Sequence, residues 1–235
     1  MHISPDSIVL WRVGPVALNA TIFCTWLVMG LLLLISWLVT RRLRVEPPLS
    51  RWQNFLEALV SYMRDQVAEI TQQEPARYLP FLGTLFLFIS LSNLLAPVPV
   101  YEPPTASLST AAALAICVFF AVPIYGVTRR GVFGYLKHYV QPTPLMLPFT
   151  VIGELSRTLA LAVRLFGNMM SGTMIAGILL VVAPLLVPVL MEALGLLIGQ
   201  IQAYIFAVLA AVYIASGTRA DRQAPTSQEQ SQGGS

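Results

Sequence analysis

The stretch LALAVRLFGNMMSG, residues 159–172, contains the feature on which the interpretation of this chain depends. Arg164 is the only charged residue between Leu159 and Pro184, and its neighbours are Leu, Ala, Val and Phe. On membrane-insertion scales a central arginine costs roughly 2.5–3.5 kcal/mol. An arginine placed in such a segment is therefore expected to face a partner, a cavity or an ion path.

The composition indicates that this segment lies in a membrane. Of 235 residues, 56% are hydrophobic and 11% are charged, whereas a soluble domain carries roughly 25% charged residues. The mean hydropathy is +0.72. We therefore expect an all-α polytopic membrane protein with one membrane domain, 1–217, and spans at about 16–39, 78–96, 108–127, 149–183 and 188–216.

Positive charges in the connecting segments predict the topology. Basic residues follow the first, third and fifth apolar segments, and such residues mark the cytoplasmic side. A topology with the N-terminus outside and the C-terminus inside places all of these basic residues on the cytoplasmic side. They are Arg41, Arg42, Arg44, Arg129, Arg130, Arg219 and Arg222. Residues 50–73 have the periodicity of a cytoplasmic amphipathic helix. The polar tail, 218–235, is expected to be disordered.

The helix expected at 149–183 is too long to stand upright. Its 35 or so residues span roughly 52 Å, against a hydrocarbon core of about 30 Å, so we expect two long, strongly tilted C-terminal helices. On a helical wheel Arg164, Asn168 and Ser171 fall within about 40° of one another, and Thr173 points to the opposite face.

The final helix combines a row of small residues with four polar side chains. Small residues at every fourth position allow close approach of another helix, and they are Gly195, Gly199, Ala203, Ala207, Ala211 and Ala215. We expect this row to pack against the helix that carries Arg164 or against its own hairpin partner. The polar residues are Glu192, Gln200, Gln202 and Tyr204, and Glu192 is the only charge between Leu185 and Ser216.

Each of these polar residues has a structural as well as a functional interpretation. Arg164 either forms an internal ion pair with Glu192 or Glu154, or meets a carboxylate of another subunit. Glu192 lies either in water at the outer interface or on an aqueous ion path. Gln202 and Asn93 are each candidates for plain hydrogen bonds between helices.

Enzyme motifs are absent from the sequence. It has no Walker A pattern, histidine cluster, paired-carboxylate motif or G-x-S-x-G in a suitable setting. We therefore predict no catalytic residue, no metal site and no cofactor, with membrane lipid but no nucleic acid as a partner. An unrelated secondary transporter with an intramembrane Arg–Glu pair is the alternative, although no repeat relates the two halves.

Four segments resemble the same protein family, subunit a of F-type ATP synthases. They are LSRTLALAVRLFGNMMSG (155–172), IQAYIFAVLAAVYIA (201–215), NLLAPVPVYEPPTASLSTAAALA (93–115) and RWQNFLEALVSYMRDQV (51–67). They occur in the family's order, and the resemblance covers roughly residues 47–216. The resemblance implies that the chain is the static half of a rotary motor in the bacterial inner membrane. It also implies that the chain is a non-catalytic subunit and that the ATP chemistry takes place on other subunits.

The resemblance also implies partners and residue roles. The partners are a ring of c subunits, each with an ion-binding carboxylate, b-type peripheral stalk subunits and the rest of the complex. Arg164 matches the family's essential arginine, Gln202 its partner on the last helix, and Asn168 the neighbouring polar position. Two offset half-channels lead to the ring, and the further candidates for lining them are Ser171, Thr173, Glu154, Gln200, Tyr204 and Asn93.

The sequence departs from the family pattern where the outer half-channel is expected. Many members have an acidic residue where Thr173 stands, and often histidine or another acid near Gly195. Glu192, about one turn from Gly195, is therefore our candidate for the polar group of that channel. In its compact length and in Thr173 the chain is similar to an alternate bacterial branch of the family. The sequence leaves open whether the transported ion is H⁺ or Na⁺.

Overall fold

The computed structural model describes residues 9–13, 16–41, 51–98, 101–140, 146–182 and 187–219. In chain order the elements are β1 (Val9–Val13), β2 (Val16–Asn19), α1 (Ala20–Thr40), α2 (Arg51–Thr71), η2 (Pro75–Arg77), α3 (Leu79–Leu94), η3 (Pro104–Ala106), α4 (Leu108–Val140), α5 (Met146–Val182) and α6 (Val187–Arg219). Apart from one short hairpin, the described chain is helical, which confirms the predicted all-α polytopic class.

Four of the described helices are long and apolar enough to cross a membrane, namely α1, α4, α5 and α6. The remaining apolar helix, α3, has 16 residues and is about 24 Å long at 1.5 Å per residue. Alone it falls short of the hydrocarbon core of about 30 Å. The chain is therefore a multi-pass membrane protein in which the consecutive helices α3 and α4 have different main partners, since α3 packs mainly against α6 and α4 mainly against α5.

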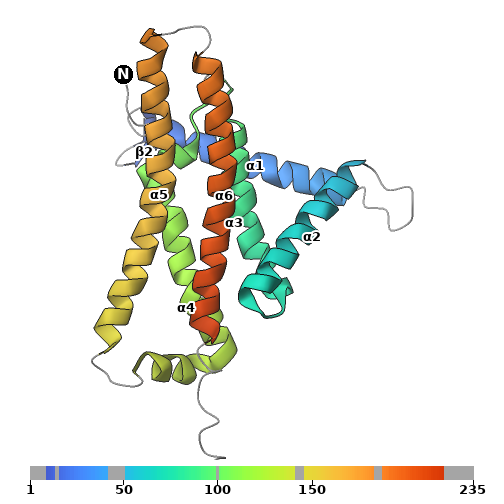
Figure 1. Cartoon of the computed structure of the whole chain (residues 1–235), viewed down its shortest axis with the longest axis vertical. Helices are drawn as coiled ribbons and strands as arrows, with labels where there is room; N and C mark the ends of the chain where they lie inside the picture. Colours follow the sequence, from blue (N-terminus) through green and yellow to red (C-terminus); the bar gives the residue numbers. More distant parts are fainter. Residues whose placement is uncertain are drawn as a thin grey trace, which may run out of the picture.

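The long helices do not share the direction of the first one. Figure 1 shows α5 and α6 side by side along the long axis of the molecule, with α1 lying across them. The 37 residues of α5 span about 56 Å. If α1 crosses the bilayer upright, α5 and α6 must be strongly tilted, because helices that cross one another cannot all follow the membrane normal.

The N-terminal part of the first predicted span is wrong. We expected helix from Val16, whereas residues Val16–Asn19 form β2, which pairs antiparallel with β1. Valine and tryptophan favour strands because their side chains pack well on a pleated surface. The apolar run therefore continues through two kinds of secondary structure, and the helix begins only at Ala20.

The amphipathic helix has the predicted faces. It covers Arg51–Thr71, within the expected range 50–73. Val67 and Thr71 are buried, and α2 contacts α3 and α6. The charged side chains on its other faces are exposed, namely Glu57, Arg64, Asp65 and Glu69. Packing of one apolar face thus holds α2 against the bundle while its polar faces remain free.

Helix α4 extends beyond its expected end at residue 127. It continues to Val140 across a break at Gly131, where φ is 73° and ψ is 163°. Such a positive φ is readily available only to glycine, so the break can occur at this residue. The chain turns there, and the last part of α4 runs across one end of the bundle (Figure 1).

The core lies where α3, α4, α5 and α6 meet. Its largest fully buried side chains come from each of these helices and include Leu82, Ile89, Val118, Leu161, Leu165, Phe206 and Ile214. On α6 the buried positions recur every three or four residues, as on one face of a helix. The polar tail, 218–235, lies almost wholly outside the described residues.

Candidate functional site

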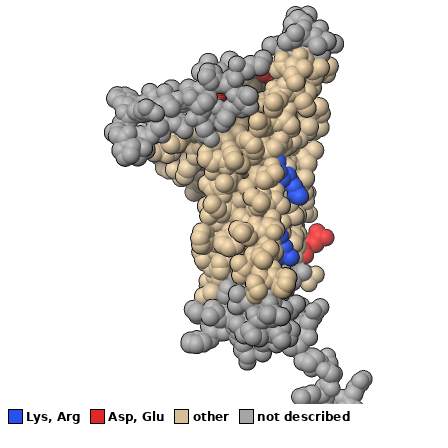
Figure 2. All heavy atoms as spheres, turned by 90° about the vertical axis from the view of Figure 1, so that its left-hand side faces the viewer, with Lys and Arg blue, Asp and Glu red and all other residues tan. Residues whose placement is uncertain are grey.

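Arg164 lies on an exposed face of α5 in the isolated chain. Leu159 and Val163 beside it are 63% and 53% exposed, and the Arg164 side chain is exposed as well. Figure 2 shows a few charged side chains interrupting a broad uncharged surface. Within the described part of the chain, Arg164 makes no ion pair with Glu192 or Glu154. The internal ion pairs that we considered are thus not formed.

Gln202 lies on α6 with its side chain directed into the protein. It is 5% exposed, and its Nε2 atom has no hydrogen-bond partner among the described residues. The Arg157 guanidinium carbon lies 5.7 Å from the centre of the Tyr213 ring, which gives the approximate antiparallel register of α5 and α6. Counting seven residues along each helix from this contact places Arg164 near the level of Phe206. Gln202 is then one helical turn, about 5.4 Å, beyond that level.

A cavity of about 490 Å³ lies beyond Gln202 along the α5–α6 pair. We call it the turn cavity because the turn between α3 and α4 closes one side of it. Its polar lining contains five of the predicted residues and two that the prediction omitted: Asn93, Asn168, Ser171, Thr173 and Glu192, with Tyr101 and Glu102. Thr173 lines this cavity although an ideal wheel places it opposite Arg164. The structure therefore brings most of the candidates for lining a channel together.

Glu102 and Tyr101 are the residues of this cavity that sequence reasoning missed. Oε2 of Glu102 and the hydroxyl of Tyr101 are buried and have no hydrogen-bond partner among the described residues. Burial raises the pKa of the Tyr101 phenol, so this group is neutral at physiological pH. The sequence signal that could have pointed to this cavity is the pair of adjacent ionisable residues in a turn that is otherwise rich in proline.

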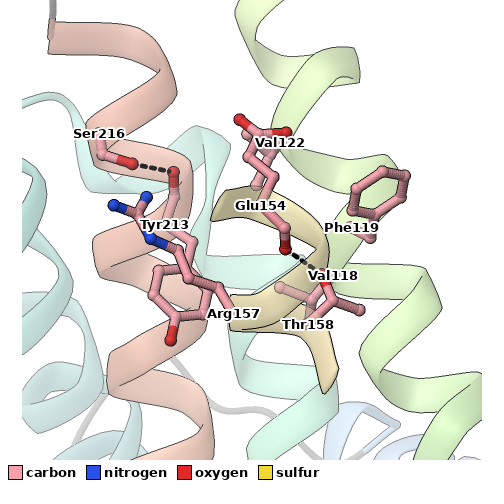
Figure 3. Close-up of a pocket in the computed structure, with 8 residues that line it drawn as sticks. All are labelled: Val118, Phe119, Val122, Glu154, Arg157, Thr158, Tyr213 and Ser216. Carbon is pink, nitrogen blue, oxygen red and sulfur yellow. Dashed lines mark hydrogen bonds between the residues drawn. The ribbon is translucent and has the colours of Figure 1, made fainter. Parts of the chain in front are cut away.

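A second, smaller hollow lies on the other side of Arg164. Its volume is about 20 Å³ and its lining includes Glu154, Arg157, Thr158, Tyr213 and Ser216, so we call it the Arg157 cleft. Figure 3 shows Arg157 reaching toward α6 beside Tyr213, whereas Glu154 lies on the side of α4. A hollow of this size holds about one water molecule. Among the predicted residues, Glu154 is the one that the structure places here.

Arg164 lies between these two hollows along α5. Thr158 in the Arg157 cleft precedes it by six residues, or about 9 Å, and Asn168 in the turn cavity follows it by four residues, or about 6 Å. No described residue lines both hollows. Along α5, Arg164 thus lies between the residues that line the two hollows, and it lines neither of them.

Three further predicted residues form hydrogen bonds between helices. Gln200 on α6 accepts a hydrogen bond from the Ser90 hydroxyl and donates one of 3.0 Å to the Ser90 carbonyl. Tyr204 donates a bond of 2.8 Å to Gln66 on α2. Asn93 on α3 donates to the carbonyl of Gly199 at 2.8 Å. These contacts hold α6 against α2 and α3. Asn93 both makes such a contact and lines the turn cavity.

The row of small residues does not make its closest approach to the helix that carries Arg164. A Cβ atom built at Gly199 would lie 3.0 Å from the Asn93 side chain of α3, so the closest approach is to α3 and not to α5. Gly195 meets nothing within 4 Å and lines the turn cavity. Only part of the row therefore serves helix packing.

The fold and these polar groups define an all-helical, multi-pass membrane protein with a charged group on an intramembrane helix face. A family model described as "ATP synthase A chain" matches residues 22–215. A protein of Acaryochloris marina named "ATP synthase subunit a 2" is 60% identical over 222 residues, which are 94% of this chain and 95% of that protein. "ATP synthase subunit a 1" of Chlorobaculum parvum is 59% identical over 219 residues, or 93% of this chain and 97% of that one.

A third relative, "ATP synthase subunit a" of Albidiferax ferrireducens, is 56% identical over 225 residues, which are 96% of this chain and 97% of that protein. The chain belongs to the ATP synthase subunit a family. It is thus a membrane component of a complex engaged in ATP synthesis and ion transport, and this membership excludes the alternative of an unrelated transporter.

Proposed function

We propose that this chain is the ion-translocating stator subunit of the membrane sector, with two half-channels separated by the Arg164 side chain. The observation that carries the proposal is the position of Arg164 on α5, between the turn cavity and the Arg157 cleft. A single continuous pore would let ions cross without work. Two separate hollows on either side of a fixed positive charge instead require the ion to leave the chain and return.

The exposed apolar face of α5 supports a moving partner beside Arg164. Leu155, Leu159 and Val163 are each more than half exposed, and large exposed apolar patches mark sites of contact with lipid or protein. We infer that a ring of c subunits rotates against this face. A rotor carboxylate that meets Arg164 gains Coulomb energy when it is ionised, so the arginine favours release of the ion at this point.

Arginine suits this role because its guanidinium does not deprotonate in proteins. It can attract a carboxylate, but it cannot pass a proton from one hollow to the other. Each ion must therefore travel with the ring between the half-channels. Each charge that crosses a potential of 100 mV supplies about 2.3 kcal/mol, and several crossings drive the synthesis of one ATP on other subunits.

Gln202 fits the same scheme. It is buried close to the level of Arg164, and its amide nitrogen is without a partner among the described residues. A buried donor of this kind gains when an acceptor arrives. We infer that Gln202 donates to water near the arginine, with Asn168 one turn further toward the turn cavity.

The positive-inside pattern assigns sides to the two hollows. Arg129, Arg130 and Arg219 put the end of the bundle that holds the Arg157 cleft in the cytoplasm, and the turn cavity then opens outward. The N-terminus is outside, the C-terminus is inside, and the membrane is the bacterial inner membrane. We propose Glu192 as a polar group of the outer half-channel, Glu154 of the inner one, and b-type stalk subunits as neighbours.

Two-sided labelling tests this assignment. In a complex whose subunit a lacks its native thiols, Cys24 and Cys117, Ser171→Cys should react with a membrane-impermeant thiol reagent added from the outer side only. Thr158→Cys should react from the cytoplasmic side only. Equal reaction of both positions from one side would overturn the proposal of two separate half-channels.

A further inference from the structure

Helix α6 is joined to α3 by a reciprocal pair of side-chain hydrogen bonds. The Ser90 hydroxyl donates to the Oε1 atom of Gln200, and the Nε2 atom of Gln200 donates to the Ser90 carbonyl at 3.0 Å. One turn away on α3, Asn93 donates to the Gly199 carbonyl. Two neighbouring residues of α6 are thus bonded to one face of α3, the helix against which α6 packs more extensively than against α2, α4 or α5.

Apolar packing alone does not determine the rotation of α6 about its own axis. Apolar side chains occur on every side of the helix, and no strong apolar stripe distinguishes a core face from a lipid face. In a membrane no hydrophobic force turns one such face inward, so packing and interhelical hydrogen bonds decide how helices face one another. A single buried polar contact can fix the register of two helices in this way.

The bonded side chain and Gln202 face different sides of α6. At 100° per residue, Gln200 and Gln202 lie about 160° apart around the helix. Gln202 lies within about 20° of Tyr213, eleven residues later, and Tyr213 contacts Arg157 of α5. The rotation in which Gln200 meets α3 is therefore the rotation in which Gln202 is directed toward α5, the helix that carries Arg164.

The Nε2 atom of Gln202 has no hydrogen bond that would hold it in this direction. The residue is buried, and this atom is without a partner among the described residues. A rotation of α6 by about 30° would move a side-chain atom that lies about 5–6 Å from the helix axis by about 3 Å. This displacement is as large as the donor–acceptor distance of a hydrogen bond, so the place of the amide depends on contacts made elsewhere on α6.

We propose that Ser90 and Gln200 are positioning residues, which lock the rotation of α6 and thereby keep the Gln202 amide directed toward the Arg164 helix. This inference rests on the proposed function, because it presupposes that Gln202 acts near Arg164 in coupled transport. Neither Ser90 nor Gln200 lines the turn cavity or the Arg157 cleft. The pair therefore acts through Gln202 and not on the ion itself.

The experiment uses the complete complex in membrane vesicles and measures the ions pumped per ATP hydrolysed. Gln200→Met removes both hydrogen bonds and keeps the length of the side chain. It should lower this coupling ratio about two- to tenfold, the factor that corresponds to the net contribution of one hydrogen bond. Ser90→Ala removes one bond of the pair and should have a smaller effect in the same direction.

Two further variants on α3 are the controls. Ser90→Thr retains the hydroxyl and should keep the coupling ratio of the parent. Thr84→Ala also removes one hydroxyl, but that hydroxyl is exposed and bonds only to the Pro80 carbonyl of its own helix. It is therefore the matched control for Ser90→Ala and should leave the coupling ratio unchanged.

Cross-linking gives a readout that does not depend on activity. In a chain that lacks Cys24 and Cys117, a cysteine at position 164 is paired in turn with cysteines at positions 201, 202 and 203, which point about 100° apart around α6. The pair with position 202 should give the highest yield. When Gln200→Met is added, the yield at 202 should fall relative to the yields at the two flanking positions, because α6 is no longer held in one rotation.

A pair of bonds that only adds stability would lower the temperature of thermal inactivation and leave the coupling ratio and the cross-linking pattern unchanged. That result would overturn the inference, and so would a change in only one of these two readouts. If Gln200→Met does not assemble, Ser90→Ala compared with Thr84→Ala decides by the same readouts. The proposed function fails in a different way, if Arg164→Ala retains normal coupled pumping.

Discussion

The side-chain amide of Asn93 on α3 donates a hydrogen bond of 2.8 Å to the backbone carbonyl of Gly199 on α6. The contact is possible because Gly199 has no side chain, since a Cβ atom there would lie 3.0 Å from Asn93. One turn further along α6, Gln202 lies near the level of Arg164. The position of the polar groups of α6 therefore depends on its close approach to α3.

Gly199→Leu should separate α6 from α3 and impair coupled transport without changing any charge. Overpacking of a well-packed site typically costs about 1–3 kcal/mol, so we also expect a lower temperature of thermal inactivation of the assembled complex. Gly153→Leu on α5 is the control, because nothing lies within 4 Å of a Cβ atom there. Equal behaviour of the two variants would mean that the Asn93–Gly199 contact does not position α6.

Cysteines at positions 164 and 202 should be joined in assembled complexes by a cross-linking reagent about 10 Å long, or by a disulfide if their Cα atoms lie within about 7 Å. The register set by Arg157 and Tyr213 supports this expectation. A pair at 157 and 213 serves as the positive control, because those side chains are in contact. If the control pair joins and the 164–202 pair does not, the two residues are not neighbours.

Glu192→Gln should slow ATP-driven ion pumping and shift its dependence on external pH, because the turn cavity would lose half of its carboxylate charge. Glu192→Leu should slow it further, since an apolar side chain also removes water from the cavity wall. Pumping is measured in vesicles, with the exposed Glu57→Gln variant as control. Turnover like the parent's for both variants at every pH would make Glu192 only an interface residue.

Asn93→Ala should destabilise the complex, because it removes the side-chain donor to the Gly199 carbonyl and leaves the Thr105 hydroxyl without its acceptor. The loss of buried hydrogen-bond partners typically costs about 1–3 kcal/mol. Thr84→Ala on the same helix, whose hydroxyl is exposed and bonds locally to Pro80, provides the control. A thermal inactivation temperature as high as the control's would show that this contact contributes no stability.

The sequence predicted the elements whose physical signal is local. The amphipathic period gave α2 within two residues at each end, and the apolar runs gave α5 and α6 within three residues of their observed ends. It did not predict β2, because an apolar run without a break can be either strand or helix. It also ended α4 at residue 127, before the break at Gly131.

The candidate site was predictable only in part. Arg164 was evident because a charge in an apolar segment is conspicuous, and Glu192 for the same reason. Glu102 was missed because a glutamate in a Pro-rich turn has the composition of an ordinary exposed loop, and only the folded chain places it in a cavity with Glu192. The hydrogen bonds of Gln200 and Tyr204 likewise depend on Ser90 and Gln66, which no local pattern connects to them.

The central claim is that Arg164 separates two half-channels and is required for coupled transport. The most direct measurement is ATP-driven ion pumping by membranes that carry Arg164→Ala, with assembly of the complex checked by its content of the other subunits. We predict normal assembly and no coupled pumping, and Arg164→Lys should not restore full function, because lysine lacks the planar guanidinium and can deprotonate when buried. Near-normal pumping by a fully assembled Arg164→Ala complex would contradict the account.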